Sequence, residues 1–191
     1  MYNIVLIGST GSGKDFILNN LIEKYNLEKI IIDCTRPKRE GEVDGETYNF
    51  LTNDEFEQNA RNKKYLDQQT YNTIHGEWKY GLNVDSLLKN NSIAILDKEA
   101  LIKYKKLFPD CISIFISTID ETERFYRSVM RMKNISINDV KEVYRRIKTD
   151  EDKFYDIEKF VDYIVPQTYN NITLDLIYDI VDKTGLEKRR V

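Results

Sequence analysis

The sequence predicts an α/β fold in which a parallel sheet is flanked by helices. Three observations support this prediction. Short, continuous apolar runs are typical of strands that are buried on both faces, as in parallel sheets. Segments with helical spacing separate these runs, and such alternation favours parallel pairing. The first apolar run also ends in a glycine-rich loop that opens a helix.

The first unit is a strand–loop–helix–strand. The continuous apolar run at residues 4–7 predicts the first strand, and it ends at Gly8. Apolar residues recur with helical spacing between residues 16 and 22, which predicts a helix. A second apolar run at residues 30–32 predicts the next strand.

Residues 34–85 differ in character, because they are polar, rich in Tyr and Gly, and contain no continuous apolar strand. We expect one strand ending at Phe50, a short helix over 53–61 and a hairpin over about 65–80. The aromatic side chains can build a small core of their own. We therefore interpret this stretch as an inserted lobe.

The α/β alternation then resumes. The pattern predicts strands at 92–96, 111–116 and 161–165. It predicts helices at about 99–107, 121–133, 138–155 and 173–182. The helices over 121–133 and 138–155 are rich in Arg and Lys.

The bulk properties exclude several classes of protein. The net charge is −3, from 29 basic and 32 acidic residues, so we expect no nucleic-acid or membrane partner. Cys34 and Cys111 lack the spacing of a zinc site and are expected to be reduced core thiols. No basic-then-apolar leader opens the sequence, and no apolar run approaches the roughly 20 residues of a membrane helix. A cytoplasmic location is expected.

The loop after the first strand carries the GxxxxGK part of the Walker A pattern. Its glycines let backbone N–H groups converge on phosphate oxygens at a helix N-terminus. Lys14 supplies a positive charge for the β- and γ-phosphates. The alternative is a glycine-rich turn without function. We predict that ATP binds at Gly8, Ser9, Thr10, Gly11, Ser12, Gly13, Lys14 and Asp15.

Asp15 departs from this pattern, because Ser or Thr normally follows the lysine and offers a hydroxyl to Mg²⁺. A carboxylate is also a hard oxygen ligand. We therefore predict that Asp15 lies on the metal side of the nucleotide, holding Mg²⁺ directly or through water. The activity is expected to depend strictly on Mg²⁺.

Residues 35–50 read TRPKREGEVDGETYNF and closely resemble the TRxxRxGExxGxxYxF signature of guanylate kinases. The order of elements resembles that family over nearly the whole chain. The resemblance implies a P-loop kinase core, an inserted nucleoside-monophosphate (NMP) binding lobe and a helical lid in one domain. The core is assigned to 1–33, 86–120 and 155–191, the NMP-binding lobe to 34–85, and the lid region to 121–154.

The same resemblance implies a phosphate site for the acceptor. Arg36 and Arg39 have planar guanidinium groups that suit bidentate phosphate binding. Tyr48 and Tyr80 match tyrosines that bond the monophosphate. The alternative for the two arginines is a solvated basic loop that is paired with Glu40 and Glu42.

The base-reading positions depart from the family. Asp67 stands where guanylate kinases usually carry Glu, and a carboxylate accepts from guanine N1–H and N2–H. Leu82 stands where the family uses a Ser or Thr hydroxyl. These departures concern the choice of base and not the kinase chemistry.

Asp97 ends the predicted strand at 92–96, where a carboxylate faces Mg²⁺, its water or the acceptor. The alternative is a cap for the following helix. Glu99 is a candidate for the second acid of the family.

Arg127 and Arg131 are one helical turn apart and match lid arginines. Arg145 and Arg146 form a second pair, of which Arg146 aligns better. The alternative is a salt-bridged surface that uses Glu123 and Glu142. Arginines stabilise the charge of a phosphoryl-transfer transition state. No general base is required, and His75 is expected to be structural.

We therefore expect ATP-dependent phosphorylation of GMP or dGMP by a monomer or homodimer. The alternatives are a kinase for another (deoxy)nucleoside monophosphate or for ribose 1,5-bisphosphate, and a non-catalytic guanylate-kinase-like interaction module. The retained Gly13 and Lys14 argue against the last of these.

Overall fold

The computed structural model describes residues 3–87, 91–117, 120–168 and 171–187. Its larger sheet has five strands, and every neighbouring pair is parallel. Their order across the sheet is β2 (Glu28–Lys29), β7 (Ser92–Ile95), β1 (Asn3–Gly8), β8 (Ile112–Ser117) and β9 (Tyr163–Pro166). The predicted α/β class with a parallel sheet is confirmed.

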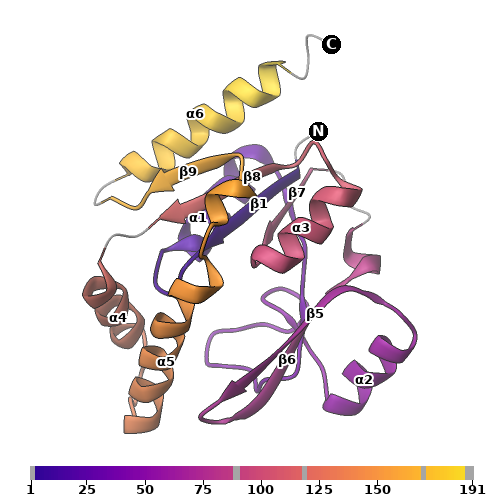
Figure 1. Ribbon diagram of the computed structural model, residues 1–191, viewed down its shortest axis with the longest axis vertical. Coiled ribbons are helices and arrows are strands. Elements are labelled where there is room, and N and C mark those ends of the chain that lie inside the picture. Colours follow the sequence, from indigo (N-terminus) through magenta and orange to yellow (C-terminus); the bar gives the residue numbers. More distant parts are fainter. Residues whose placement is uncertain (1–2, 88–90, 118–119, 169–170, 188–191) are drawn as a thin grey trace.

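Helices cover both faces of this sheet (Figure 1). One core cluster joins inward side chains of α1 (Lys14–Tyr25) and α6 (Ile172–Glu187), including Leu21 and Ile177. The other cluster joins α3 (Lys98–Leu107) to the opposite face through Leu101 and Tyr104. Because β1 is buried from both sides, its sequence is continuously apolar rather than alternating.

A second, four-stranded sheet occupies the region between residues 33 and 83. Its order is β4 (Asn49–Phe50), β3 (Asp33–Cys34), β6 (Gly76–Asn83) and β5 (Tyr65–Thr73), with α2 (Asn53–Arg61) beside it. Asp33 is buried and accepts hydrogen bonds from Asn49, Tyr65 and Asn83. A single carboxylate therefore ties β4, β5 and β6 to β3. A short 3₁₀ helix (Val84–Leu87) follows β6.

Two further helices, α4 (Glu121–Met130) and α5 (Ile137–Lys153), pack against each other. In Figure 1 this pair and the second sheet extend from the same side of the larger sheet and face one another. A 3₁₀ turn (Ile157–Lys159) leads from α5 to β9.

The strand predicted at 30–32 is displaced. The strand that pairs with β7 is β2, at residues 28–29, which lies just before the predicted range. One further hydrogen bond continues the pairing, from Ile30 N–H to Ile93 O at 2.9 Å. The chain then crosses to the second sheet, where β3 begins at Asp33. Ile30 belongs to the second core cluster, so its apolar character reflects burial in the core and not a position in a strand.

Cys34 and Cys111 are both free and buried. None of the helices in the described ranges is long and apolar enough to cross a membrane.

Candidate active site

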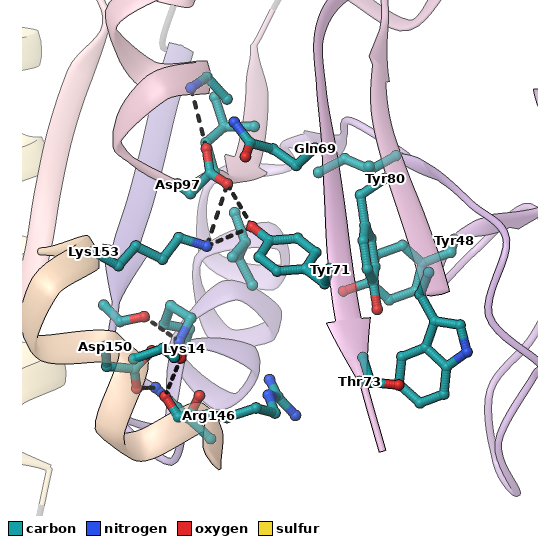
Figure 2. A pocket seen from close by; sticks show the side chains of 18 of the residues that line it. Lys14, Tyr48, Gln69, Tyr71, Thr73, Tyr80, Asp97, Arg146, Asp150 and Lys153 are labelled. Atoms are coloured by element: carbon teal, nitrogen blue, oxygen red, sulfur yellow. Dashed lines mark hydrogen bonds and ion pairs between the residues drawn. The ribbon is translucent and has the colours of Figure 1, made fainter. Parts of the chain in front are cut away.

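A cavity of about 260 Å³ lies where the larger sheet, the second sheet and α5 meet. Figure 2 shows side chains from these three units directed toward it. The glycine-rich loop supplies Gly8, Thr10 and Lys14 to its wall. The cavity therefore joins the predicted ATP loop to the predicted acceptor residues.

The glycine-rich loop is built so that larger residues do not fit. Gly11 and Gly13 have positive φ angles of 80° and 83°, a conformation that favours glycine. A Cβ atom on Gly8 would lie 2.9 Å from Ile116 O, and one on Gly11 would lie 2.6 Å from Arg124 O. The loop thus packs directly on β8 and on α4.

Lys14 is folded onto its own loop. Its Nζ donates to Gly8 O at 2.6 Å, to Ser9 O at 2.8 Å and to Ser12 Oγ at 3.3 Å. Burial lowers the pKa of Lys14 to about 8, although the carboxylates of Asp15 and Asp150 oppose this shift. The side chain remains a cation at neutral pH.

Asp15 is exposed in the first turn of α1. Within the described ranges, no three His, Cys, Asp or Glu side chains gather closely enough to hold a metal ion by themselves. A Mg²⁺ ion bound to a nucleotide takes most of its ligands from phosphate and water and only one or two from carboxylates. Asp15 beside the loop suits that partial role.

The two predicted acceptor arginines have different surroundings. Arg36 is buried, and its guanidinium forms a bidentate pair with Glu42 at 2.6 and 2.5 Å. Glu40 instead pairs with Lys133 beyond α4. Arg39 lines the cavity. Desolvation, together with the nearby charges of Arg36 and Arg146, lowers the pKa of Arg39.

Tyr48 and Tyr80 both line this end, with ring centroids 5.9 Å apart and nearly perpendicular. The Arg36 guanidinium lies 5.0 Å from the Tyr48 ring centroid. Burial raises the pKa of Tyr48 to about 12. Both phenols therefore stay protonated at neutral pH and can donate to a phosphate.

Asp67 is buried on β5 and also lines the cavity. One of its oxygens accepts from Lys103 Nζ at 2.6 Å, and the other accepts from Gln69 Nε2 at 3.3 Å. Leu82 lies opposite Asp67 in the β5–β6 ladder and is buried. The cavity wall here combines one carboxylate and one carboxamide.

Asp97 caps α3, which was the alternative to a functional role, and it also lines the cavity. One oxygen caps α3 by accepting from Ala100 N at 3.1 Å. The other accepts from Tyr71 Oη at 3.0 Å and lies 3.3 Å from Lys153 Nζ. Figure 2 shows this cluster, in which the core, β5 and α5 each contribute one side chain. Asp97 is therefore already paired with a cation of α5.

The predicted lid arginines divide into two groups. Arg145 and Arg146 line the cavity, whereas Arg127 and Arg131 are not among its lining residues. Arg127 pairs with Glu123, and Arg145 pairs with Glu142 at 2.7 Å. Salt bridging was the alternative for these helices. It applies to Arg127 and to Arg145, each of which pairs with a glutamate on its own helix. Arg146 is close enough to Lys14 to lower the pKa of the lysine.

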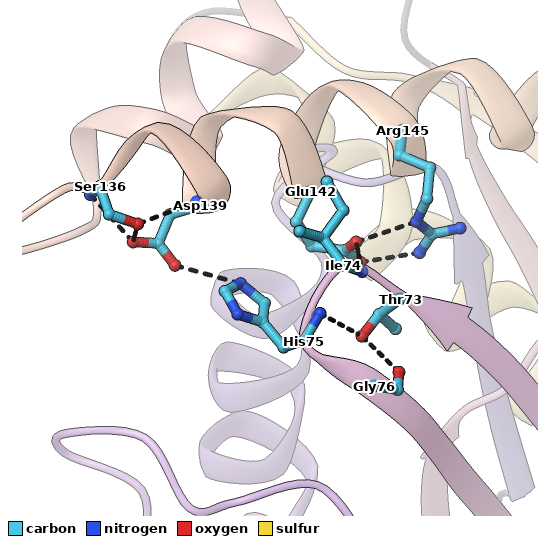
Figure 3. A network of polar contacts seen from close by, with 8 residues as sticks. All are labelled: Thr73, Ile74, His75, Gly76, Ser136, Asp139, Glu142 and Arg145. Atoms are coloured by element: carbon cyan, nitrogen blue, oxygen red, sulfur yellow. Dashed lines mark hydrogen bonds and ion pairs between the residues drawn. The ribbon is translucent and has the colours of Figure 1, made fainter.

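The tip of the β5–β6 hairpin touches α5 across the cavity (Figure 3). Ile74 N–H donates to Glu142 Oε2 at 3.3 Å, and His75 Nε2 lies 3.4 Å from Asp139 Oδ1. The His75 ring also stacks on Trp78. His75 therefore has structural contacts, and the hairpin tip connects the second sheet to α5.

Several cavity residues were missed by sequence reasoning: Gln69, Tyr71, Asp150 and Lys153. The alternation of side chains along β5 places residues 67, 69, 71 and 73 on one face, which was a usable signal for Gln69 and Tyr71. No such local signal exists for Asp150 and Lys153, because both reach the site by the packing of α5.

Comparisons with known proteins identify the family of this chain. A family model described as guanylate kinase matches residues 1–183. A guanylate kinase of Hydrogenovibrio crunogenus is 27% identical over 180 residues, which cover 92% of this chain and 84% of that protein. One of Chlorobium luteolum is 29% identical over 109 residues, so the alignment spans only about half of each, 56% and 55%.

A crystal structure of guanylate kinase from Anaplasma phagocytophilum has the same fold. The TM-score is 0.62 at 21% sequence identity, and the match covers 97% of this chain and 85% of that one.

Proposed function

Because the chain belongs to the guanylate kinase family, we propose that it transfers the γ-phosphoryl group of ATP to GMP or dGMP. The observation that carries this proposal is that one cavity is lined both by Lys14 and by Arg39, Tyr48, Tyr80 and Asp67. Donor loop and acceptor residues face one space, as a direct transfer requires.

The donor nucleotide is assigned to the loop from Gly8 to Asp15. Its backbone N–H groups and the α1 N-terminus favour the phosphates, and Lys14 must leave its loop carbonyls to reach them. Mg²⁺, when bound, neutralises charge on the β- and γ-phosphates. Asp15 and Asp97 are the carboxylates proposed to face it.

The acceptor is assigned to the lobe over 34–85. Arg39, Tyr48 and Tyr80 are proposed to hold its phosphate directly. Arg36 is proposed to position the Tyr48 ring, against which its guanidinium lies, while Glu42 holds that guanidinium in place. Asp67 is proposed to accept from N1–H and N2–H of guanine, after exchanging its contact with Lys103.

The transfer itself needs no general base, because the acceptor phosphate is already ionised at neutral pH. One of its oxygens forms a bond to the γ-phosphorus, and the bond from that phosphorus to the β–γ bridging oxygen breaks, giving ADP and a nucleoside diphosphate. Arg146 and Lys14 are proposed to stabilise the charge in between. Arg127 and Arg131 are proposed to join them if the region 121–154 moves as a lid.

The test is a screen of purified protein with ATP, Mg²⁺ and a panel of nucleoside monophosphates and ribose 1,5-bisphosphate, read as ADP release. GMP and dGMP are expected to turn over fastest. Inert GMP and dGMP beside an active pyrimidine monophosphate would contradict the proposed acceptor. ATP binding that is lost in Lys14→Ala separates an enzyme from an interaction module.

A further inference from the structure

A carboxylate from α5 reaches the glycine-rich loop. Asp150 Oδ2 accepts a hydrogen bond from the backbone N–H of Thr10 at 2.6 Å. The same oxygen accepts from Arg124 Nη1 of α4 at 3.0 Å. A backbone N–H and a guanidinium thus converge on one anionic oxygen, which is the geometry of an oxyanion site. Figure 2 shows Asp150 next to Lys14.

The surroundings of this oxygen are buried and contain unused donors. Arg124 is only 6% exposed and Asp150 only 8%. Within the described ranges, Arg124 Nε and Ser128 Oγ are buried without hydrogen-bond partners. Both residues also lie against Gly11 of the loop. Donors on α4 therefore remain available to a larger anion at the same place.

We propose that Asp150 Oδ2 occupies an oxyanion position that belongs to the nucleotide, and that a phosphate oxygen of ATP replaces it. This inference rests on the proposed function, since it concerns the phosphates of the donor. Two anions cannot share one buried position, so ATP must displace the carboxylate. Arg124 then pairs with phosphate instead of Asp150.

The exchange links the nucleotide to the position of α5. Asp150 lies on the same helix as Arg146 and Lys153, which line the cavity. Release of Asp150 frees that helix from the loop, so nucleotide binding and α5 movement affect each other reciprocally. Asp150 is a positioning residue in this scheme, and Arg124 is a phosphate-binding residue.

The competing explanation is that Arg124 and Asp150 form a structural ion pair between α4 and α5. Asp150→Asn separates the two, because Asn keeps an acceptor for Thr10 N–H but removes the charge. We expect the Kd of a non-hydrolysable ATP analogue, measured by calorimetry without acceptor, to fall about fivefold or more. Asp152→Asn on the same helix is the matched control and should leave Kd unchanged.

An unchanged or higher Kd in Asp150→Asn overturns the proposal. Asp150→Ala serves as a second variant if the Asn variant folds poorly, as judged by its melting temperature. Asp150→Ala also removes the charge and should likewise tighten analogue binding. A purely structural ion pair between α4 and α5 predicts weaker binding instead.

Arg124 is tested in the Asp150→Asn background. Arg124→Gln added there should weaken analogue binding about fivefold or more, because the phosphate loses its guanidinium. If the double variant binds as tightly as Asp150→Asn alone, the role of Arg124 is refuted. Failure of the GMP reaction with intact analogue binding would contradict the proposed function and leave this inference standing.

Discussion

The charge of Lys14 sets a pH limit on the reaction. Burial lowers the pKa of its ammonium group to about 8. Only the protonated form attracts the β- and γ-phosphates. At saturating GMP, kcat/KM for ATP reports the GMP-bound enzyme to which ATP binds. We predict that this kcat/KM falls as the pH rises, with a midpoint near 8. A pH-independent kcat/KM up to pH 9.5 would show that Lys14 keeps an ordinary pKa.

The base is read by Asp67 if the proposed acceptor is correct. In Asp67→Asn an amide N–H group replaces one acceptor oxygen and opposes a guanine donor. We predict that kcat/KM for GMP falls about 100-fold or more while KM for ATP is unchanged. Asp85→Asn, an exposed change near the same lobe, is the control. A GMP rate that survives Asp67→Asn means that another residue selects the base.

Among individual residues, the sequence predicted those whose function is marked by a local sequence pattern. The glycines and Lys14 could be found because loop, strand and helix are contiguous. Asp150 could not, because it contacts Thr10 across 140 positions of sequence. The same holds for Lys103 at Asp67 and for Lys153 at Asp97. Each of these pairs exists only after the helices have packed.

Among the elements, α2 has the clearest local signal. Thr52 accepts from Glu55 N–H, and Glu55 accepts from Thr52 N–H, which is a capping box. We predict that Thr52→Ala lowers the free energy of unfolding by about 1 kcal/mol. Urea denaturation measures this, and GMP turnover should not change because Thr52 lies outside the cavity. No loss of stability would mean that α2 is held by its buried face alone.

The contact between the β5–β6 hairpin and α5 depends on Glu142. This buried carboxylate pairs with Arg145 and accepts from Ile74 N–H. Burial raises its pKa, but these hydrogen bonds outweigh burial and the net pKa is lowered. Its contribution to stability is therefore present at neutral pH and is lost as the pH falls below about 4.5 through the lowered folded value.

We predict that Glu142→Ala lowers the free energy of unfolding at pH 7 by about 1–3 kcal/mol, since Arg145 and Ile74 N–H lose their partner. Urea titration at pH 7 and at pH 4 measures the difference, which should shrink at the lower pH. Glu151→Ala, exposed on the same helix, is the control. A loss that is the same at both pH values would contradict the ionised role of Glu142.

Element boundaries illustrate where sequence patterns stop being sufficient. The range predicted for α2, 53–61, is the observed one, because its cap and its polar flank are local. The strand predicted at 30–32 is wrong, because residues 30–32 bridge two sheets. Their apolar character reports burial in the core, and burial alone does not distinguish a strand from a buried connection.

For the whole molecule, the order of apolar runs was enough to predict a parallel α/β sheet. The position of α5 against the second sheet was not predictable in the same way. It depends on contacts of the hairpin tip with Asp139 and Glu142 and on Lys153 at Asp97. The larger sheet, the second sheet and α5 all contribute lining residues to the cavity, so its full lining follows only from the assembled fold.

The central claim is that donor and acceptor react directly in this cavity, and one measurement tests it. The purified protein is incubated with Mg²⁺, GMP and ATP radiolabelled on its γ-phosphate, and the products are separated. We predict that the label appears in GDP, and that Lys14→Ala reduces this transfer by about 100-fold or more. Label that is released only as inorganic phosphate, or that never leaves ATP, would contradict the claim.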